Sequence, residues 1–173
     1  MAYGTLASII CPVLFFMFLL VLVHCGVIQG EKTTHLHFYF HEIYSGPNVT
    51  GVAVVNPPRN DSAFGAMGMV DDMLKEGPDP SSKLIGRAQG LTAVPSMEQN
   101  GGILTMLNFV FTDGPFNGST LAIFGRAVLG SVMERAIIGG TGNFRMARGY
   151  TLSKQVPSTQ GLLVLEYDAY ISH

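Results

Sequence analysis

The stretch from Val132 to Tyr150 reads VMERAIIGGTGNFRMARGY, and its glycines and arginines stand at offsets that determine how the neighbouring chain folds. Three glycines between Gly139 and Gly142 follow an apolar run and allow the backbone to take positive φ values. From Asn143 to Tyr150 the residues alternate with the two-residue period of a β-strand, and arginines fall on both faces. The stretch therefore predicts a strand, a glycine turn and a second strand, with cations placed for an anionic or phenolic ligand.

Strands and turns of the same kind continue through the rest of the chain. Short apolar runs alternate with turns rich in Gly, Pro and Asn, and no segment keeps a helical period for three turns. This spacing predicts antiparallel neighbours in one all-β domain, whose sheet curls and closes to remove its edges. The nine candidate strands are 35–44, 50–56, 64–72, 83–94, 102–112, 119–126, 133–138, 143–152 and 161–171.

The first 30 residues form an uncharged block, because every Lys, Arg, Asp and Glu lies at or after Glu31. The apolar segment from Ile9 to Val23 has the length of a secretory h-region. We therefore interpret residues 1–30 as a signal peptide, cleaved between about positions 25 and 30, and residues 31–173 as the mature domain. An uncleaved signal anchor is the alternative, since the segment before the apolar run carries no basic side chain.

The cysteines, the net charge and the sequons indicate which kinds of site and partner to expect. Both cysteines, Cys11 and Cys25, lie in the N-terminal block, so we expect neither a disulfide nor a thiolate metal ligand in the mature domain. The net charge is −2 without a strong basic cluster, which argues against a nucleic-acid partner. Sequons at Asn48, Asn60 and Asn117 lie in turns and predict N-glycosylation in the secretory pathway, although turn-rich sequence also produces such triplets by chance.

Four blocks of the sequence together resemble the dirigent family of secreted plant proteins. They are FYFHEI (Phe38–Ile43), SSKLIGRAQG (Ser81–Gly90), FNGSTLAIFGR (Phe116–Arg126) and the stretch quoted above, and the resemblance covers about residues 34–171. It implies an eight-stranded antiparallel β-barrel that assembles as a homo-oligomer, with a trimer favoured and a dimer as the alternative. One of the nine candidate strands is then a short or irregular connection, and we expect it to be 133–138.

Two carboxylates have the strand parity of the barrel interior. Glu42 follows Leu36, Phe38 and Phe40 on one face of the first strand, and Asp72 shares its parity with Val70. Burial there raises the pKa of a carboxyl group and makes it a usable proton donor or acceptor. Solvated strand ends are the alternative for both. The resemblance places a functional acidic residue at Glu42, where the family usually has Asp.

Cations and aromatic residues complete the candidate site. We expect Phe40, Arg87, Phe144 and Arg148 to contact the substrate, with Glu42 or Asp72 as a partner for Arg87 if it points inward. Alternation around Ile123 and Gly125 predicts that Arg126 points outward.

The chain also departs from the family pattern within this region. Ala127 replaces a common Asn or Asp, Met133 replaces a common Arg, and the segment around Thr92 replaces aromatic residues. Arg135 would then substitute for the missing arginine as a catalytic residue.

The histidines raise the question of a metal. His35, His37 and Glu42 have the spacing of half a cupin metal motif, and two histidines with a carboxylate suit zinc or manganese. A cupin needs a further histidine from a later strand, and after His41 the next histidine is His173. We therefore expect solvent-facing histidines and no bound metal, with a metal site as the alternative.

The resemblance implies a function in phenolic chemistry outside the cell, in the apoplast. A dirigent protein holds two phenoxy radicals, such as those of coniferyl alcohol, and selects one enantiomer of the lignan. A separate laccase or peroxidase supplies the radicals, so we expect no cofactor and, once the signal is removed, no membrane association. Glu42 first and Asp72 second would assist closure of the quinone methide. The alternatives are a dehydratase of the pterocarpan synthase type, which also forms a quinone methide, and a defence protein that only binds phenolics.

Overall fold

Side chains along the first strand alternate between a buried face and an exposed face. In β1 (Thr33–Ile43) Phe38 and Phe40 are buried, whereas His35 and His37 on the other face are exposed. The computed structural model describes residues 31–98 and 101–173, so the proposed signal peptide lies outside the described residues. Residues 32–173 form one compact unit.

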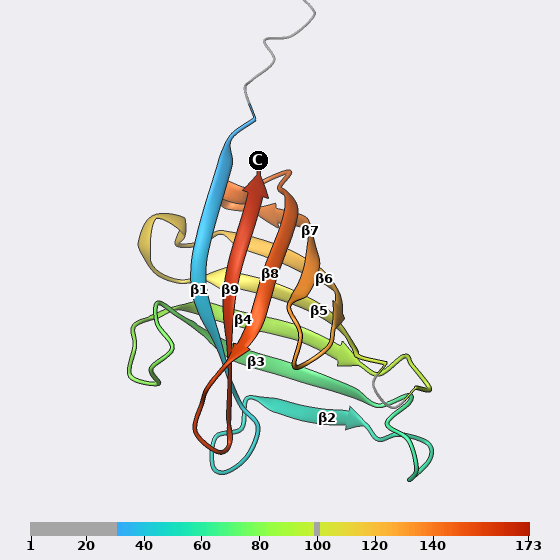
Figure 1. Ribbon diagram of the computed structural model, residues 1–173. Coiled ribbons are helices and arrows are strands. Elements are labelled where there is room, and N and C mark those ends of the chain that lie inside the picture. Colours follow the sequence, from blue (N-terminus) through green and yellow to red (C-terminus); the bar gives the residue numbers. More distant parts are fainter. Residues whose placement is uncertain (1–30, 99–100) are drawn as a thin grey trace, which may run out of the picture. The chain divides into compact units, whose positions relative to one another are not determined.

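All the strands belong to one antiparallel sheet with the order β1-β9-β8-β7-β6-β5-β4-β3-β2 (Figure 1). A further pairing of β1 with β3, between residues 39–41 and 73–75, closes the sheet into a barrel. The strands after β1 are β2 (Gly51–Val55), β3 (Met67–Lys75), β4 (Leu84–Ala93), β5 (Ile103–Phe111), β6 (Thr120–Ala127), β7 (Met133–Thr141), β8 (Arg148–Val156) and β9 (Leu162–Ser172).

The predicted eight-stranded antiparallel barrel is confirmed, but the choice of the extra strand was wrong. Residues 133–138 belong to β7, a full strand that pairs with both β6 and β8. The strand outside the barrel is β2, which has five residues and pairs with β3. The lengths of the candidate strands 50–56 and 133–138 could not show which one lies outside the barrel. A strand belongs to the closed barrel only if it pairs with a neighbour on each side, and this depends on the tertiary arrangement.

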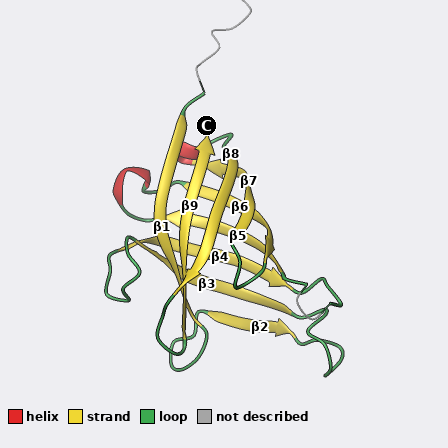
Figure 2. Cartoon of the chain, viewed as in Figure 1, coloured by secondary structure: helices red, strands yellow, loops and turns green. Residues whose placement is uncertain are grey.

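The glycine corner after β7 also differs from the prediction. Residues Gly142–Phe144 form a short 3-10 helix, η2, and β8 begins at Arg148 instead of position 143 (Figure 2). Gly142 has φ +62, and a Cβ there would lie 2.6 Å from the Ser119 hydroxyl oxygen. A second 3-10 helix, η1 (Gly114–Phe116), forms part of the β5–β6 connection.

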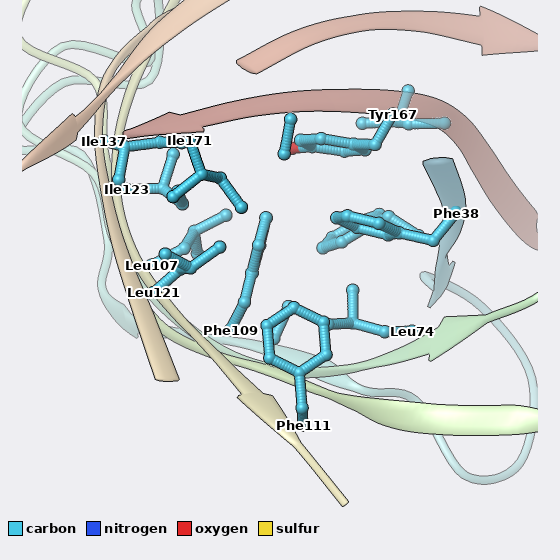
Figure 3. Close-up of a cluster of buried hydrophobic side chains, with 14 of the residues drawn as sticks. Phe38, Leu74, Leu107, Phe109, Phe111, Leu121, Ile123, Ile137, Tyr167 and Ile171 are labelled. Atoms are coloured by element: carbon cyan, nitrogen blue, oxygen red, sulfur yellow. The ribbon is translucent and has the colours of Figure 1, made fainter. Parts of the chain in front are cut away.

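Aromatic side chains fill the interior at one end of the barrel. Phe38 stacks on Tyr167 with ring centroids 5.4 Å apart and meets Phe109 edge-on at 5.6 Å (Figure 3). Phe144 is fully buried against Phe116, with centroids 4.8 Å apart. Edge-to-face and offset pairs of this kind stabilise the interior in addition to the burial of apolar area, so this end of the interior is densely packed.

No helix among the described residues is long and apolar enough to cross a membrane.

Candidate functional site

A cavity of about 380 Å³ occupies the other end of the barrel interior. Its walls are mainly apolar, and the lining residue Phe40 on β1 contacts Tyr167 of the aromatic packing, with ring centroids 6.1 Å apart. A small set of polar side chains interrupts these walls: Glu42, Tyr44, Asp72, Thr92, Thr105, Arg135, Gln155 and Tyr167. An apolar cavity with a few convergent polar groups is the usual form of a small-molecule site.

Asp72, on β3, is the most perturbed carboxyl group of this cavity. Its side chain is fully buried, and Oδ1 accepts a hydrogen bond from the Thr50 hydroxyl at 2.5 Å. Oδ2 has no hydrogen-bond partner within the described part of the chain. Burial raises the pKa of Asp72 to about 7, against the opposing effect of the Thr50 hydrogen bond. The group is therefore mostly a neutral carboxylic acid at mildly acidic pH, and it can donate a proton into the cavity.

Glu42, on β1, is half-buried and lines the same cavity. Burial raises its pKa above the usual range, and its charge in turn helps to raise the pKa of Asp72. A nearby negative charge disfavours ionisation of a carboxyl group, so the Glu42 charge adds to burial in keeping Asp72 neutral. The cavity thus carries an acid and a potential base on adjacent strands.

Arg135, on β7, is buried with 3% of its surface exposed and contacts hydroxyl groups. Its guanidinium donates to Ser153 Oγ at 2.7 Å and to the Tyr167 hydroxyl, with a longer contact of 3.4 Å to Thr105 Oγ1. The ion pairs found among the described residues do not involve Arg135, and its Nε lacks a hydrogen-bond partner there. A buried cation with neutral partners is suited to an oxygen atom that gains negative charge.

The cavity brings together four of the predicted site residues and leaves three outside. Phe40, Glu42, Asp72 and Arg135 line it, and for the first three this agrees with the parity of their strands. Arg87, Phe144 and Arg148 do not, so we no longer expect them to contact a ligand in this cavity. Phe144 belongs to the aromatic packing at the opposite end, and Arg148 is exposed.

Arg87 lies on the outer face of the barrel and pairs with Asp71 instead of Glu42 or Asp72. Its Nε is 2.8 Å from Asp71 Oδ1. The register places Asp72 opposite Ala88, so the outward residues Arg87 and Asp71 are diagonal neighbours. Arg126 is exposed, which confirms its outward prediction.

One histidine differs from its predicted environment. His41 was expected to face solvent but is fully buried, because the β3–β4 connection covers this part of the outer face. Its Nε2 lies 3.0 Å from Gly77 O, and burial lowers its pKa. His35 and His37 remain exposed, and both contact Asp168. No group of three or more potential ligands in the described residues is placed to hold a metal ion.

Sequence reasoning missed the hydroxyl groups of the site. Thr105, Ser153 and Tyr167 share the inward parity of their strands, which an alternation count would have found. Thr50 begins the candidate strand 50–56, but β2 starts at Gly51 and Thr50 belongs to the connection before it, where strand alternation does not apply. Its contact with Asp72 follows from the tertiary arrangement.

The fold and the cavity define a class of protein, an eight-stranded antiparallel barrel that encloses a mainly apolar cavity with acidic and cationic side chains in its wall. Residues 33–172 match the family model described as dirigent-like protein, and the chain belongs to the dirigent family.

Two curated relatives illustrate the range of the family. The chain is 45% identical to pterocarpan synthase 1 of Glycyrrhiza echinata over 84% of this chain and 80% of that protein. It is 49% identical to dirigent protein 21 of Arabidopsis thaliana over 84% and 79% of the two chains. A solved pterocarpan synthase dirigent protein superposes with a TM-score of 0.77 at 42% identity, over 85% of this chain and 93% of that one.

Proposed function

We propose that this protein binds phenolic substrates in the barrel cavity and directs the stereochemistry of a step that forms or consumes a quinone methide. The observation that carries the proposal is the presence of Asp72 and Arg135 in one mainly apolar cavity. A quinone methide forms when a phenol loses its proton while a benzylic hydroxyl group leaves as water. A protonated Asp72 suits the protonation of that leaving group, and Arg135 suits the phenolic oxygen as its charge changes.

The same groups serve the coupling reaction of lignan formation. Two phenoxy radicals, supplied by a separate laccase or peroxidase, couple to a bis-quinone methide, and internal hydroxyl groups then close its rings. Each closure transfers one proton from the attacking hydroxyl to the quinone methide oxygen, so the reaction is neutral overall. Glu42 and Asp72 are suited to relay this proton, and the cavity walls to hold one face of each partner.

A specific observation favours dehydration as the second candidate function. The cavity volume of about 380 Å³ lies near the lower end of the roughly 300–1,000 Å³ typical of sites for a single drug-sized ligand. One multi-ring phenolic alcohol fits this description more directly than two separate monolignols do. The relative from Glycyrrhiza echinata is named pterocarpan synthase 1. Such a dehydration is of the pterocarpan synthase type.

Two parallel incubations test the proposal. In the first, coniferyl alcohol and laccase react with and without the protein, and chiral chromatography measures the enantiomeric excess of the lignans. In the second, a hydroxylated isoflavanol of defined configuration is incubated with the protein, and the loss of water is followed. Enantiomeric excess in the first or accelerated dehydration in the second supports the corresponding reaction. Phenolic binding without either effect would make this a binding protein and reject the proposal.

We also propose that the protein is secreted to the apoplast and glycosylated. Support comes from the exposed positions of all three sequon residues, Asn48, Asn60 and Asn117, on connections between strands. Intact-mass analysis of protein secreted from plant cells is expected to show a chain that begins between residues 26 and 31 and carries glycan. A mass that includes residues 1–25, or one without glycan, contradicts the respective part of this proposal.

We propose that copies of the chain associate as a homo-oligomer, preferably a trimer, through one outer face of the barrel. Val52, Met69, Leu91, Met106 and Phe124 are register partners that form an apolar row across β2 to β6. Four of the five are exposed in the isolated chain, from 39% for Met106 to 54% for Val52. The outer face of β1, β9 and β8 is instead polar, with ion pairs such as that between Lys154 and Glu166. A continuous exposed apolar face of this kind usually marks an interface.

Met106→Lys is expected to convert the oligomer to a monomer, because it places a charge in the centre of the apolar row. Light scattering after size exclusion measures the mass. Val132→Lys is the matched control, since Val132 is 65% exposed outside the row. A monomeric unaltered protein, or a Met106→Lys variant of undiminished mass, would contradict the proposed interface.

A further inference from the structure

Thr50 is tied to the two strands that carry the cavity carboxyl groups. Its backbone N–H donates to Ile43 O at 2.9 Å on β1, and its carbonyl accepts from Asp71 N at 2.8 Å on β3. Its hydroxyl oxygen accepts a hydrogen bond from Ile43 N at 2.9 Å and donates to Asp72 Oδ1 at 2.5 Å. The hydroxyl oxygen is thus an acceptor toward the Ile43 amide, and its O–H donates to Asp72 Oδ1.

The two oxygens of Asp72 have different surroundings. Oδ1 accepts the Thr50 hydrogen, which leaves Oδ2 as the oxygen with room for the acid hydrogen of the neutral carboxyl group. Oδ2 is buried and has no partner among the residues that the structure describes, and Asp72 lines the cavity. The proton is therefore available to a ligand instead of being used within the protein.

We propose that Thr50 is a positioning residue that holds Asp72 with its acidic proton directed to the substrate. The inference rests on the proposed function, in which Asp72 protonates a leaving group or relays a proton. Thr50 touches Asp72 and is absent from the cavity lining, so it acts through the carboxyl group.

The residue after Thr50 supports the second carboxyl group. A Cβ on Gly51 would lie 3.1 Å from Glu42 Oε1, which shows how closely the Glu42 carboxyl packs against this backbone. The segment Thr50–Gly51 thus lies beside both carboxyl groups, bonded to Asp72 through Thr50 and close to Glu42 at Gly51. A larger residue at position 51 would displace the Glu42 carboxyl group by a few tenths of an ångström.

Other charged and titratable groups also act on Asp72, and they stay in place when Thr50 is changed. Burial and the charges of Glu42 and Asp71 raise the pKa of Asp72, whereas Thr50 and Arg87 lower it. The groups that face or neighbour Asp72 are Glu42 on β1, Asp71 on β3, Arg87 on β4, Arg135 on β7 and Tyr167 on β9. Removing the Thr50 hydroxyl therefore has a predictable direction, since one stabilising contact of the carboxylate disappears.

Thr50→Val tests the proposal because it keeps the shape of the side chain and removes the hydroxyl. The rate of the reaction that the protein performs, isoflavanol dehydration or directed coupling, is measured from pH 5 to 9. We expect kcat to fall about tenfold, KM to change less than about twofold, and the alkaline limb of the kcat profile to move up by on the order of one pH unit. Thr50→Ser, which retains a hydroxyl, is expected to restore the profile of the unaltered protein.

The threonine also belongs to the Asn48 sequon, so loss of a glycan needs its own control. Thr50→Val removes the sequon, Thr50→Ser retains it, and Asn48→Gln removes it while leaving the hydroxyl in place. If Asn48→Gln reproduces the Thr50→Val profile, the glycan is responsible and the positioning role is rejected. An unshifted alkaline limb in Thr50→Val rejects it as well.

A direct titration separates this inference from the proposed function. Carbon NMR of the Asp72 carboxyl group, assigned with the Asp72→Asn variant, reports its pKa without any substrate. A higher pKa in Thr50→Val than in the unaltered protein supports the positioning role even when neither reaction is observed, in which case only the proposed function fails. An equal pKa in the two proteins overturns the role of Thr50 whatever the activity.

Discussion

Asp72→Asn is expected to lower the rate of the directed reaction by about 10²-fold or more while the barrel stays folded. General acid catalysis by a positioned side chain contributes roughly 10²- to 10⁴-fold, and asparagine has the shape of the acid without its transferable proton. The Thr50 hydroxyl can still donate to the amide oxygen, so the side chain keeps its position. Product formation at pH 6, with circular dichroism of the same samples, provides the measurement.

The same variant is expected to be more stable than the unaltered protein at alkaline pH. The folded-state pKa of Asp72, about 7, lies above the ordinary value of 3.8, so the unfolded chain loses its proton first as the pH rises. The unaltered protein therefore loses stability between about pH 4 and pH 7, by an amount on the order of 4 kcal/mol, and Asp72→Asn does not. Urea unfolding at pH 4 and pH 8 measures most of this difference.

Asp71→Asn is the matched control for both measurements. Asp71 is the exposed neighbour of Asp72 and pairs with Arg87 on the outer face. We expect this change to leave the rate within about twofold and the stability within about 1 kcal/mol, since exposed ion pairs contribute little. Equal losses of activity in the two variants would remove Asp72 from the proposed mechanism. Undiminished activity in Asp72→Asn would transfer the role of acid to Glu42.

Arg135→Met is expected to lower kcat/KM by about 10²- to 10³-fold. The guanidinium lies in the cavity beside the Tyr167 hydroxyl and has hydroxyl partners, so it is the group best placed to stabilise a phenolic oxygen that becomes charged. Methionine replaces the buried charge with an apolar side chain of similar length, a change that many interiors tolerate without loss of stability. The protein is therefore expected to fold and to retain its cavity.

Arg126→Met distinguishes a local effect from a general change of charge. Arg126 is exposed on β6 and donates to Gly101 O outside the cavity. Its replacement is expected to leave kcat/KM unchanged within about twofold. Steady-state kinetics and a thermal melt of both variants provide the comparison. A loss in Arg126→Met as large as that in Arg135→Met would show that net charge, and not the cavity arginine, controls the reaction.

The alternation of side chains along the strands predicted which residues of the site point into the barrel. Phe40, Glu42 and Asp72 follow apolar residues of the same parity, and their inward direction is confirmed. A residue's face is a local property of a strand, because successive side chains point to opposite sides of the backbone. The same alternation, with the turns between strands, predicted an all-β chain with antiparallel neighbours.

Strand alternation could not predict the level of a side chain along the barrel axis. Phe144 is fully buried, as a ligand contact would be, but it lies in the aromatic packing and not in the cavity. Parity shows whether a side chain points inward, whereas its level depends on the register of each strand with its neighbours and on the stagger of the whole sheet. The assignment of Arg87 failed for a related reason, since its partner was set by the cross-strand register that places it beside Asp71.

The sequence by itself determined an all-β domain in which the carboxyl groups of Glu42 and Asp72 point inward. Only the tertiary structure decided that β2 lies outside the barrel, that a connection buries His41, and that Thr50 meets Asp72. These three features depend on contacts between segments that are distant in the chain or joined by irregular connections. Local periodicity carries no information about such contacts, because they form only when the barrel closes.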